Sequence, residues 1–287
     1  MRISEIYQQK KPVLSFEIFP PKRDTTLKCI DETLEVLCGL KPDYISVTFG
    51  AGGSATNSLT VGLAKKIKRE YGIEPVVHLT CINYTKDEIL AFTDELAEAG
   101  IENVLALRGD KNPDIPTKEE FFYASELVSF LKEKRSNLCV AGACYPEGHT
   151  ESPDKVTDLH NLKKKTEAGA EFLLSQLFFD NDLFYKFREN MRIADIKTPV
   201  SAGIMPVINR AQIERMVTLC GASLPEKFRR ILQKYEFQKD ALFDAGMVYA
   251  VNQIVDLVAH DADGIHIYTM NNPVVAKRIC DSIKNLI

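Results

Sequence analysis

The chain has 287 residues, 45% hydrophobic and 26% charged, a composition typical of a globular protein that buries a large core without disulfides or metals. Lys and Arg number 36 against 40 Asp and Glu, and the net charge of −4 argues against a general nucleic-acid-binding surface. No run approaches 18 consecutive apolar residues, and the first residues lack an apolar signal core, so we expect neither a membrane span nor secretion.

Seven cysteines are scattered along the chain, an odd number without the spacing of a zinc site or a redox motif. Several fall inside apolar runs, where cysteine behaves as a small hydrophobic residue. The histidines also lack metal-site spacing. We therefore expect reduced thiols in a cytoplasmic protein with no protein-bound metal.

Eight apolar, β-branched runs recur along the chain, separated by segments of helical periodicity. The first seven begin about 28 to 35 residues apart, which is the length of one βα unit. About 60 residues separate the starts of the last two runs, and they hold helical segments near 209–219, 225–236 and 240–260. The expected strands cover residues 13–19, 44–49, 75–81, 103–109, 138–145, 171–178, 199–205 and 264–269.

This alternation favours a (β/α)8 barrel, the TIM-barrel class of α/β fold, over an open doubly wound sheet. No GxGxxG motif follows any of the strands, which argues against a dinucleotide-binding fold of the doubly wound kind. The chain contains no linker, low-complexity tract or charge block. We therefore expect residues 1–287 to form a single barrel domain, with extra helices between strands 7 and 8.

Polar residues alternate with apolar ones along most of these strands. Ser15 and Glu17 alternate with Leu14, Phe16 and Ile18, so the polar pair is expected to point into the barrel and the apolar set toward the helices. A charged, polar lining suits a ligand-filled mouth at the carboxyl ends of the strands, although an internal network such as Glu17 with Arg108 is the alternative. The same parity predicts that further polar residues point inward: Ser46, Thr48, His78, Thr80, Arg108 (opposite Leu105 and Leu107), Gln176, His266 and Tyr268.

Nine short motifs follow these strands in a recognisable order. They are SFEIFPPK (15–22), ISVTFGAGG (45–53), HLTC (78–81), ALRGD (106–110), YPEGH (145–149), DLHNLKKKTEAGA (158–170), QLFFD (176–180), GIMPV (203–207) and HIYTMN (266–271). Together they resemble the methylenetetrahydrofolate reductase family, in its bacterial form that consists of the catalytic domain alone. The resemblance covers nearly the whole chain. It implies a barrel enzyme that uses FAD to reduce 5,10-methylenetetrahydrofolate to 5-methyltetrahydrofolate by hydride transfer.

The resemblance implies that three residues act on the folate. Glu17 matches the general acid that protonates folate N10, and a largely apolar, ligand-closed site is expected to raise its pKa. Asp110 matches an acidic residue beside flavin and pterin, where its charge stabilises a cationic iminium. Gln176 matches a glutamine that binds the pterin edge. Read alone, Glu17 could pair with an inward Arg or His, and Asp110 could cap a helix or a turn.

A larger set matches flavin-contacting positions of the family. On the predicted helix, Asp158, Asn161 and Lys165 are spaced i, i+3 and i+7, so one face presents all three to ribose hydroxyls and a pyrophosphate. Read alone, the 163–165 lysine run is a solvated face. The implied cofactor-binding residues are Thr48, His78, Arg108, Gly109, Asp110, Tyr123, Ala124, Tyr145, His149, Asp158, Asn161, Lys164 and Lys165.

Two positions depart from the family pattern. Arg210 stands where relatives often have an aromatic residue, and Asn272 stands where they often have Arg; Arg210 could supply the charge missing at Asn272. Both lie on the side of the substrate and the electron donor. The expected donor is therefore NADH, NADPH or an iron–sulfur partner protein, and the chain could form a homo-oligomer. Gly52 and Gly53 are interpreted as a structural loop.

Two competing interpretations belong to other functional classes. A pterin-dependent methyltransferase on the same fold would bind folate but no flavin. A catalytically silent partner subunit would not need Glu17, Asp110 and Gln176 together, so their presence argues against it.

Overall fold

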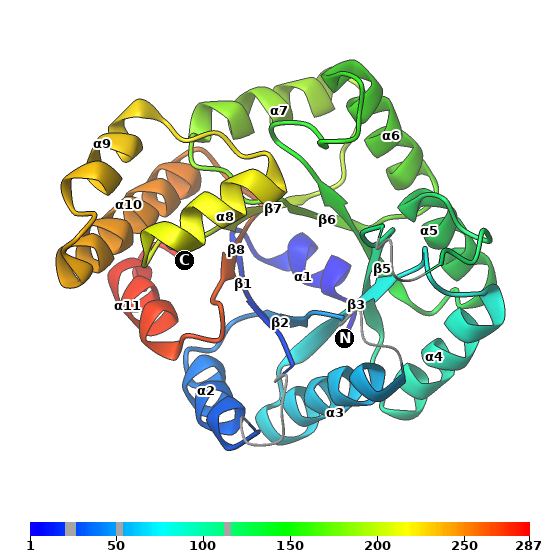
Figure 1. Cartoon of the computed structure of the whole chain (residues 1–287). Helices are drawn as coiled ribbons and strands as arrows, with labels where there is room; N and C mark the ends of the chain where they lie inside the picture. Colours follow the sequence, from blue (N-terminus) through cyan, green and yellow to red (C-terminus); the bar gives the residue numbers. More distant parts are fainter. Residues whose placement is uncertain (21–26, 50–53, 112–115) are drawn as a thin grey trace.

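Eight parallel strands close into a barrel in the computed structural model, which describes residues 1–20, 27–49, 54–111 and 116–287 (Figure 1). Neighbours along the chain pair in order, and β1 closes the ring by pairing with β8. The expected (β/α)8 barrel is confirmed, and every strand begins within one residue of its predicted start. The strands are β1 (Val13–Ile18), β2 (Tyr44–Val47), β3 (Glu74–Thr80), β4 (Asn103–Leu107), β5 (Cys139–Cys144), β6 (Phe172–Ser175), β7 (Val200–Ile204) and β8 (Gly264–Tyr268).

Helices surround the barrel, and the long segment before β8 contains the three helices expected there, α8, α9 and α10. Local sequence fixes several helix starts. At α4, Thr85 accepts a hydrogen bond from the Glu88 amide while the Glu88 carboxylate accepts one from the Thr85 amide, which is a capping box. The helices are α1 (Ile3–Gln9), α2 (Leu27–Gly39), α3 (Ser54–Tyr71), α4 (Lys86–Glu98), α5 (Ala124–Lys134), α6 (Lys155–Glu167), α7 (Asn181–Ile193), α8 (Arg210–Cys220), α9 (Glu226–Lys234), α10 (Lys239–Ala259) and α11 (Pro273–Ile283).

Two apolar layers lie on either side of the strands. The outer layer joins Leu14, Phe16 and Ile18 to the surrounding helices, as the alternation in the first strand predicts. The inner cluster includes Leu105, with Leu107 packed against it. The expectation for β4 was therefore wrong: its two leucines face the interior, and Arg108 follows the end of the strand, where alternation no longer sets its direction.

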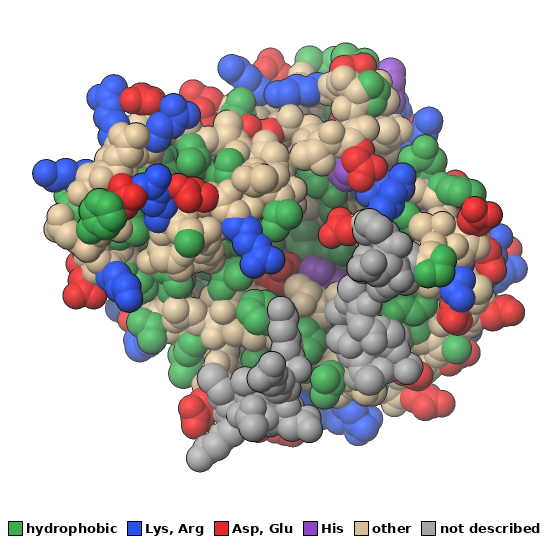
Figure 2. All heavy atoms as spheres, viewed as in Figure 1, with side chains coloured by type: hydrophobic (Ala, Val, Ile, Leu, Met, Phe, Trp, Pro, Cys, Tyr) green, Lys and Arg blue, Asp and Glu red, His purple; other side chains and the backbone are tan. Residues whose placement is uncertain are grey.

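Helix α1 closes the amino end of the barrel, and it is not among the elements predicted from the sequence. Ile3 is fully buried in the inner cluster, and its amide donates to Asn103 Oδ1 at 2.9 Å. Tyr7 Oη lies 2.6 Å from Ser201 Oγ on β7. Figure 1 shows α1 through the ring of strands. With this end covered, the carboxyl ends of the strands form the mouth, which Figure 2 shows as a hollow with acidic and histidine side chains at its floor.

Among the described segments, α10 alone is long and apolar enough to cross a membrane by length and composition. One face of it packs against β7 and the helices α7, α9 and α11, where Met247, Ile254 and Leu257 are buried. The other face leaves Val248 and Val255 exposed. Six cysteines are described, all of them free thiols and five of them buried, in agreement with their positions in apolar runs.

Candidate active site

Glu17 lies near the carboxyl end of β1, with 20% of its side chain exposed. Its Oε2 atom faces three groups from other strands: His78 Nε2 at 3.4 Å, His266 Nε2 at 3.5 Å and Ser46 Oγ at 3.5 Å. Strand register explains part of this meeting, because Glu17 pairs with Ser46 on β2 and with Tyr268 on β8. Three strands, β2, β3 and β8, therefore bring polar groups to one carboxylate on β1.

The pKa of the Glu17 carboxyl lies below its ordinary value. Burial raises this pKa, but the hydrogen bond with His266, the charge of His78 and the Ser46 hydroxyl together outweigh the effect of burial. The expected rise in pKa concerns a ligand-closed, largely apolar site and stays a prediction, whereas the groups that the structure places around Glu17 are polar. Of the two alternative partners considered for Glu17, an inward Arg or an inward His, the structure contains the histidine.

The two histidines beside Glu17 differ in their own contacts. His266 is fully buried, and its Nδ1 atom lies 2.8 Å from Ser15 Oγ, so Nε2 is the ring nitrogen that faces Glu17. His78 Nε2 is buried without a hydrogen-bond partner in the described structure. Burial lowers the pKa of His78, and the negative charge of Glu17 opposes that shift. A buried ring nitrogen that makes no hydrogen bond, although Glu17 Oε2 lies 3.4 Å away, is a group that a ligand can satisfy.

Arg108 does not reach Glu17. Its two terminal nitrogens contact the Glu151 carboxylate at 2.6 and 2.7 Å, and this pairing lowers the pKa of Glu151 to about 2. Gly109 follows with a φ of +89°. Asp110 is exposed on the same loop, where its negative charge raises the pKa of both Arg108 and Tyr145. Sequence reasoning missed Glu151, because no local pattern marks a partner 43 positions away.

The predicted pyrophosphate face of α6 is only partly presented to the mouth. Lys165 reaches inward and donates from Nζ to the Ala143 carbonyl at 2.6 Å, and burial lowers its pKa. Its side chain occupies the space beside Gly142, where an added Cβ would lie 2.6 Å from Lys165 Cδ. The negative charge of Asp158 opposes this shift in the pKa of Lys165. The Asp158 carboxylate also accepts a hydrogen bond from Ser152 Oγ at 3.0 Å. Asn161 and Lys164 are exposed on the same helix.

The remaining predicted residues lie at strand ends and on the rim. Thr48 follows β2, Tyr145 follows β5 with its ring edge-to-face on His149 at 4.6 Å, and Gln176 follows β6. The Gln176 Oε1 atom accepts from the Leu177 amide at 2.9 Å. Tyr123 and Ala124 begin α5, with the Tyr123 side chain 62% exposed. Gly52 and Gly53 lie outside the described residues.

The two departures from the family pattern have structural roles of their own. Arg210 begins α8 and forms ion pairs with Glu214 and Glu236. Asn272 caps α11, where its Oδ1 accepts from the amides of Val274 and Val275 at 3.1 and 3.3 Å. Two carboxylates already neutralise Arg210, so the suggestion that it replaces a missing charge at Asn272 finds no support.

Residues 2–284 match the family model described as methylenetetrahydrofolate reductase. The 5,10-methylenetetrahydrofolate reductases of Escherichia coli and Buchnera aphidicola are each 32% identical, over 94% and 96% of this chain and 90% and 92% of their own lengths. Methylenetetrahydrofolate reductase (NADH) 1 of Arabidopsis thaliana is also 32% identical over 94% of this chain, but the chain spans only 48% of its length.

Solved structures share the fold at low identity. An uncharacterized protein from Clostridium thermocellum, which binds two copies of 5-methyl-5,6,7,8-tetrahydrofolic acid, superimposes with a TM-score of 0.69 at 13% identity, covering 100% of this chain and 99% of that one. Tryptophan synthase from M. tuberculosis gives a TM-score of 0.57 at 14% identity, over 98% and 97% of the two chains. Both likenesses concern the barrel fold.

Proposed function

The chain belongs to the methylenetetrahydrofolate reductase family, and from that premise we propose that it reduces 5,10-methylenetetrahydrofolate to 5-methyltetrahydrofolate with FAD as cofactor. The observation that carries the proposal is the position of Glu17 at the barrel mouth, with His78, His266 and Ser46 around one carboxylate oxygen. In (β/α)8 enzymes this end of the barrel carries the active site. A carboxyl group among imidazoles can both hold and release a proton.

The residues at the mouth fit a flavin dinucleotide. His78 Nε2 is a buried atom that makes no hydrogen bond in the described structure, Tyr123 offers an exposed ring, and Lys164 offers an exposed cation. When bound, FAD supplies the hydride that reduces the folate one-carbon unit. The residues proposed to hold it are Thr48, His78, Arg108, Gly109, Asp110, Tyr123, Ala124, Tyr145, His149, Asp158, Asn161, Lys164 and Lys165.

Glu17 is the proposed general acid. It donates its proton to folate N10, which opens the five-membered ring to a cationic iminium. The carboxyl must therefore be protonated when folate is bound, although its pKa in the free protein is lowered. Ring systems that cover the mouth remove water from its exposed surface and shift the pKa upward. His266, held by Ser15, keeps the carboxylate in place and lies close enough to return the proton.

Two further residues complete the proposed folate site. The Asp110 carboxylate stabilises the positive charge of the iminium. The Gln176 amide uses its Oε1 atom on the Leu177 backbone, which leaves its NH₂ group to donate to the pterin edge. For the electron donor we propose NADH, supported by the name of the Arabidopsis relative; an iron–sulfur partner protein is the alternative.

Replacement of Glu17 by Gln tests the assignment. The variant is expected to keep the visible flavin spectrum and its bleaching by NADH without oxygen, but to transfer electrons to methylenetetrahydrofolate at least about 100-fold more slowly, since general acids contribute roughly 10²–10⁴. Glu98→Gln, at the end of α4, is the matched control.

Each of three results would contradict part of the proposal. A Glu17→Gln variant that reduces folate at the wild-type rate would exclude the acid role. A protein that stays colourless after reconstitution with FAD would exclude the flavin assignment and favour the flavin-free methyltransferase. A flavin that NADH does not bleach would favour a partner protein as electron donor.

A further inference from the structure

The loop between β5 and α6 presents one carboxylate to a distant part of the chain. A hydrogen bond from the Gly148 amide to the Tyr145 carbonyl, 3.0 Å long, closes a turn in this loop. Proline at the second position and glycine at the fourth are typical of such a turn, and Pro146 occupies the second. The turn places Glu147 between Tyr145 and His149, two of the residues proposed to hold FAD. Glu147 itself has no role in the proposed reaction.

The Glu147 carboxylate binds the turn between α8 and α9. Its Oε1 and Oε2 atoms accept from the Ser223 amide at 2.9 and 3.1 Å, across 76 positions of the chain. A second contact lies beside this one. Gly221 ends α8 with a φ of +67°, and an added Cβ there would lie 2.6 Å from Thr150 Cγ2. The turn between α8 and α9 therefore approaches the flavin-side loop closely at two points, and glycine is required at one of them.

Helix α8 borders the mouth on the side where β7 and β8 end (Figure 1). Ile213 of α8 packs in one apolar cluster with Leu177 and Met205, which lie beyond the ends of β6 and β7. At the other end of α8, burial raises the pKa of Cys220, and the negative charge of Asp110 adds to the rise. The last turn of α8 thus comes within electrostatic range of a residue proposed to act on the folate.

One stripe of α8 is suited to border a ligand. Gln212, Met216 and Cys220 are spaced i, i+4 and i+8, so they share one face of the helix, and all three are half-buried. Gln212 Nε2 reaches Met205 Sδ at 3.9 Å, which turns this face toward the end of β7. Side chains that are neither packed away nor fully solvated can form the wall of a folate site.

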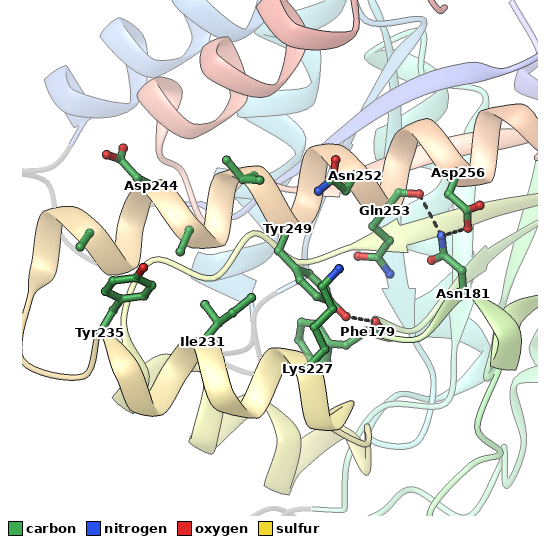
Figure 3. Close-up of a pocket in the computed structure, with 13 residues that line it drawn as sticks. Phe179, Asn181, Lys227, Ile231, Tyr235, Asp244, Tyr249, Asn252, Gln253 and Asp256 are labelled. Carbon is green, nitrogen blue, oxygen red and sulfur yellow. Dashed lines mark hydrogen bonds between the residues drawn. The ribbon is translucent and has the colours of Figure 1, made fainter.

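The other helix of the pair, α9, is joined to the barrel at one end. Phe228 of α9 stacks on Tyr249 of α10 with ring centroids 4.0 Å apart, and Tyr249 Oη donates to the Phe179 carbonyl at 2.6 Å. Beyond that contact, a groove of about 640 Å³ separates α9 from α10 (Figure 3). The pair α8–α9 therefore has room to shift on α10, and the hydrogen bonds to Glu147 limit that shift.

We propose that Glu147 is a positioning residue, which holds α8 as the folate-side wall of the mouth. This inference rests on the proposed function and adds a residue outside the proposed folate and flavin sets. Because Glu147 lies on the loop that carries Tyr145 and His149, one carboxylate sets the distance between the flavin side and the folate side of the mouth.

Replacement of Glu147 by Ala in the flavin-loaded protein tests this role. A hydrogen bond to a charged group contributes roughly a factor of 10 to 100 to an equilibrium, so the KM for methylenetetrahydrofolate and the dissociation constant of 5-methyltetrahydrofolate are expected to rise about tenfold. The kcat at saturating folate is expected to stay within about threefold of the wild type, because Glu17 and Asp110 are unchanged. A merely structural role would lower stability without this split.

Two further variants separate positioning from folding. Glu147→Gln keeps an oxygen acceptor and is expected to hold KM within about threefold of the wild type. Gly221→Ala leaves Glu147 in place but brings a Cβ against Thr150, and it is expected to raise KM as Glu147→Ala does. Glu133→Ala, which removes an exposed carboxylate of α5, is the matched control with unchanged KM.

Hydrogen exchange followed by mass spectrometry measures the attachment of α8 directly. The amides of residues 210–224 are expected to exchange about tenfold faster in Glu147→Ala than in the wild type, since the hydrogen bonds that hold the end of α8 are lost. The amides of α4 are expected to keep the wild-type rate, which establishes that the barrel remains folded.

Three results would overturn the inference. They are a Glu147→Ala variant with the KM of the wild type, one with wild-type exchange in residues 210–224, or one whose kcat falls about 100-fold at unchanged KM, which would place Glu147 in the chemical step. A wild type that binds no 5-methyltetrahydrofolate would instead contradict the proposed function. The exchange measurement would still decide whether Glu147 holds α8.

Discussion

At the scale of single residues, the surroundings at the barrel mouth set the protonation of the side chains that the sequence marks as important. Burial acts in opposite directions on a carboxyl and an imidazole: it raises the pKa of Glu17 and lowers that of His78. Polar contacts reverse the result for Glu17, whereas His78 keeps a lowered pKa. Both shifts make the folded protein less stable as the pH falls, in different pH ranges.

His78 accounts for the loss of stability in the higher of the two pH ranges. Its folded pKa lies below 6.5, so the unfolded chain binds a proton that the folded protein does not, and stability decreases as the pH falls below 6.5. Between pH 7 and 5.5, we expect wild-type unfolding free energy to fall by up to about 1 kcal/mol more than that of His78→Gln. Urea unfolding at each pH measures this, with exposed His160→Gln as the control. Parallel pH profiles of wild type and His78→Gln would contradict it.

Glu17 affects the stability of the folded protein at lower pH. Because its pKa is lowered from 4.5, the stability that it contributes is present above that value and is lost as the pH falls through the folded pKa.

The backbone of Gly109, at the barrel mouth, adopts a conformation that favours glycine. Its φ of +89° strains any other residue, and an added Cβ would lie 3.1 Å from Thr80 Cβ. Gly109→Ala is expected to lower the unfolding free energy by about 1–3 kcal/mol. Gly62→Ala, on α3 with open space around the added Cβ, is the control and is expected to raise it by about 0.5–1 kcal/mol. Equal effects of the two changes in chemical denaturation would contradict the strain argument.

At the scale of elements, the two departures from the family pattern are explained by helix termini. Arg210 begins α8, where a positive charge is unfavourable beside the helix dipole, and Glu214 and Glu236 compensate it. Asn272 is the capping residue of α11, a role for which Asn is among the best side chains.

Replacement of Asn272 by Ala is expected to cost about 1 kcal/mol of unfolding free energy, since the amides of Val274 and Val275 lose their acceptor. Asn272→Asp keeps the acceptor and is expected to remain close to the wild type. Thermal and urea unfolding compare the three proteins. An Ala variant as stable as the wild type would exclude the capping contribution.

At the scale of the whole molecule, α1 makes the two ends of the barrel different, because it covers one of them. The helix fills the amino end and extends the inner apolar cluster, so the open end of the barrel is the one where Glu17 and its partners lie. Ile3 is the part of α1 that is fully buried in that cluster.

Ile3→Ala is therefore expected to destabilise the protein by about 2–5 kcal/mol, because it removes buried volume that neighbouring strands cannot fill. Exposed Ile193→Ala is the control, expected to change stability by less than about 0.5 kcal/mol. Denaturant midpoints measure both. A small effect at Ile3 would mean that α1 contributes little to barrel closure.

The sequence by itself determined the eight strands, the three helices before β8 and the positions of Glu17, Thr48, Tyr145 and Gln176 at or near strand ends. Period-two alternation and βα spacing are local properties, and a closed parallel barrel follows from their repetition. The proposed roles of these residues rest on family membership and stay predictions until the Glu17→Gln assay is done.

Only the tertiary structure decided which groups meet. The lowered pKa of Glu17, the pairing of Arg108 with Glu151 and the inward direction of Leu105 each depend on residues distant in sequence. So does the position of α1, whose apolar residue Ile3 is buried because the barrel interior lies against it. Closure of the barrel brings such residues within a few ångströms, and no periodicity along the chain encodes which of them will face each other.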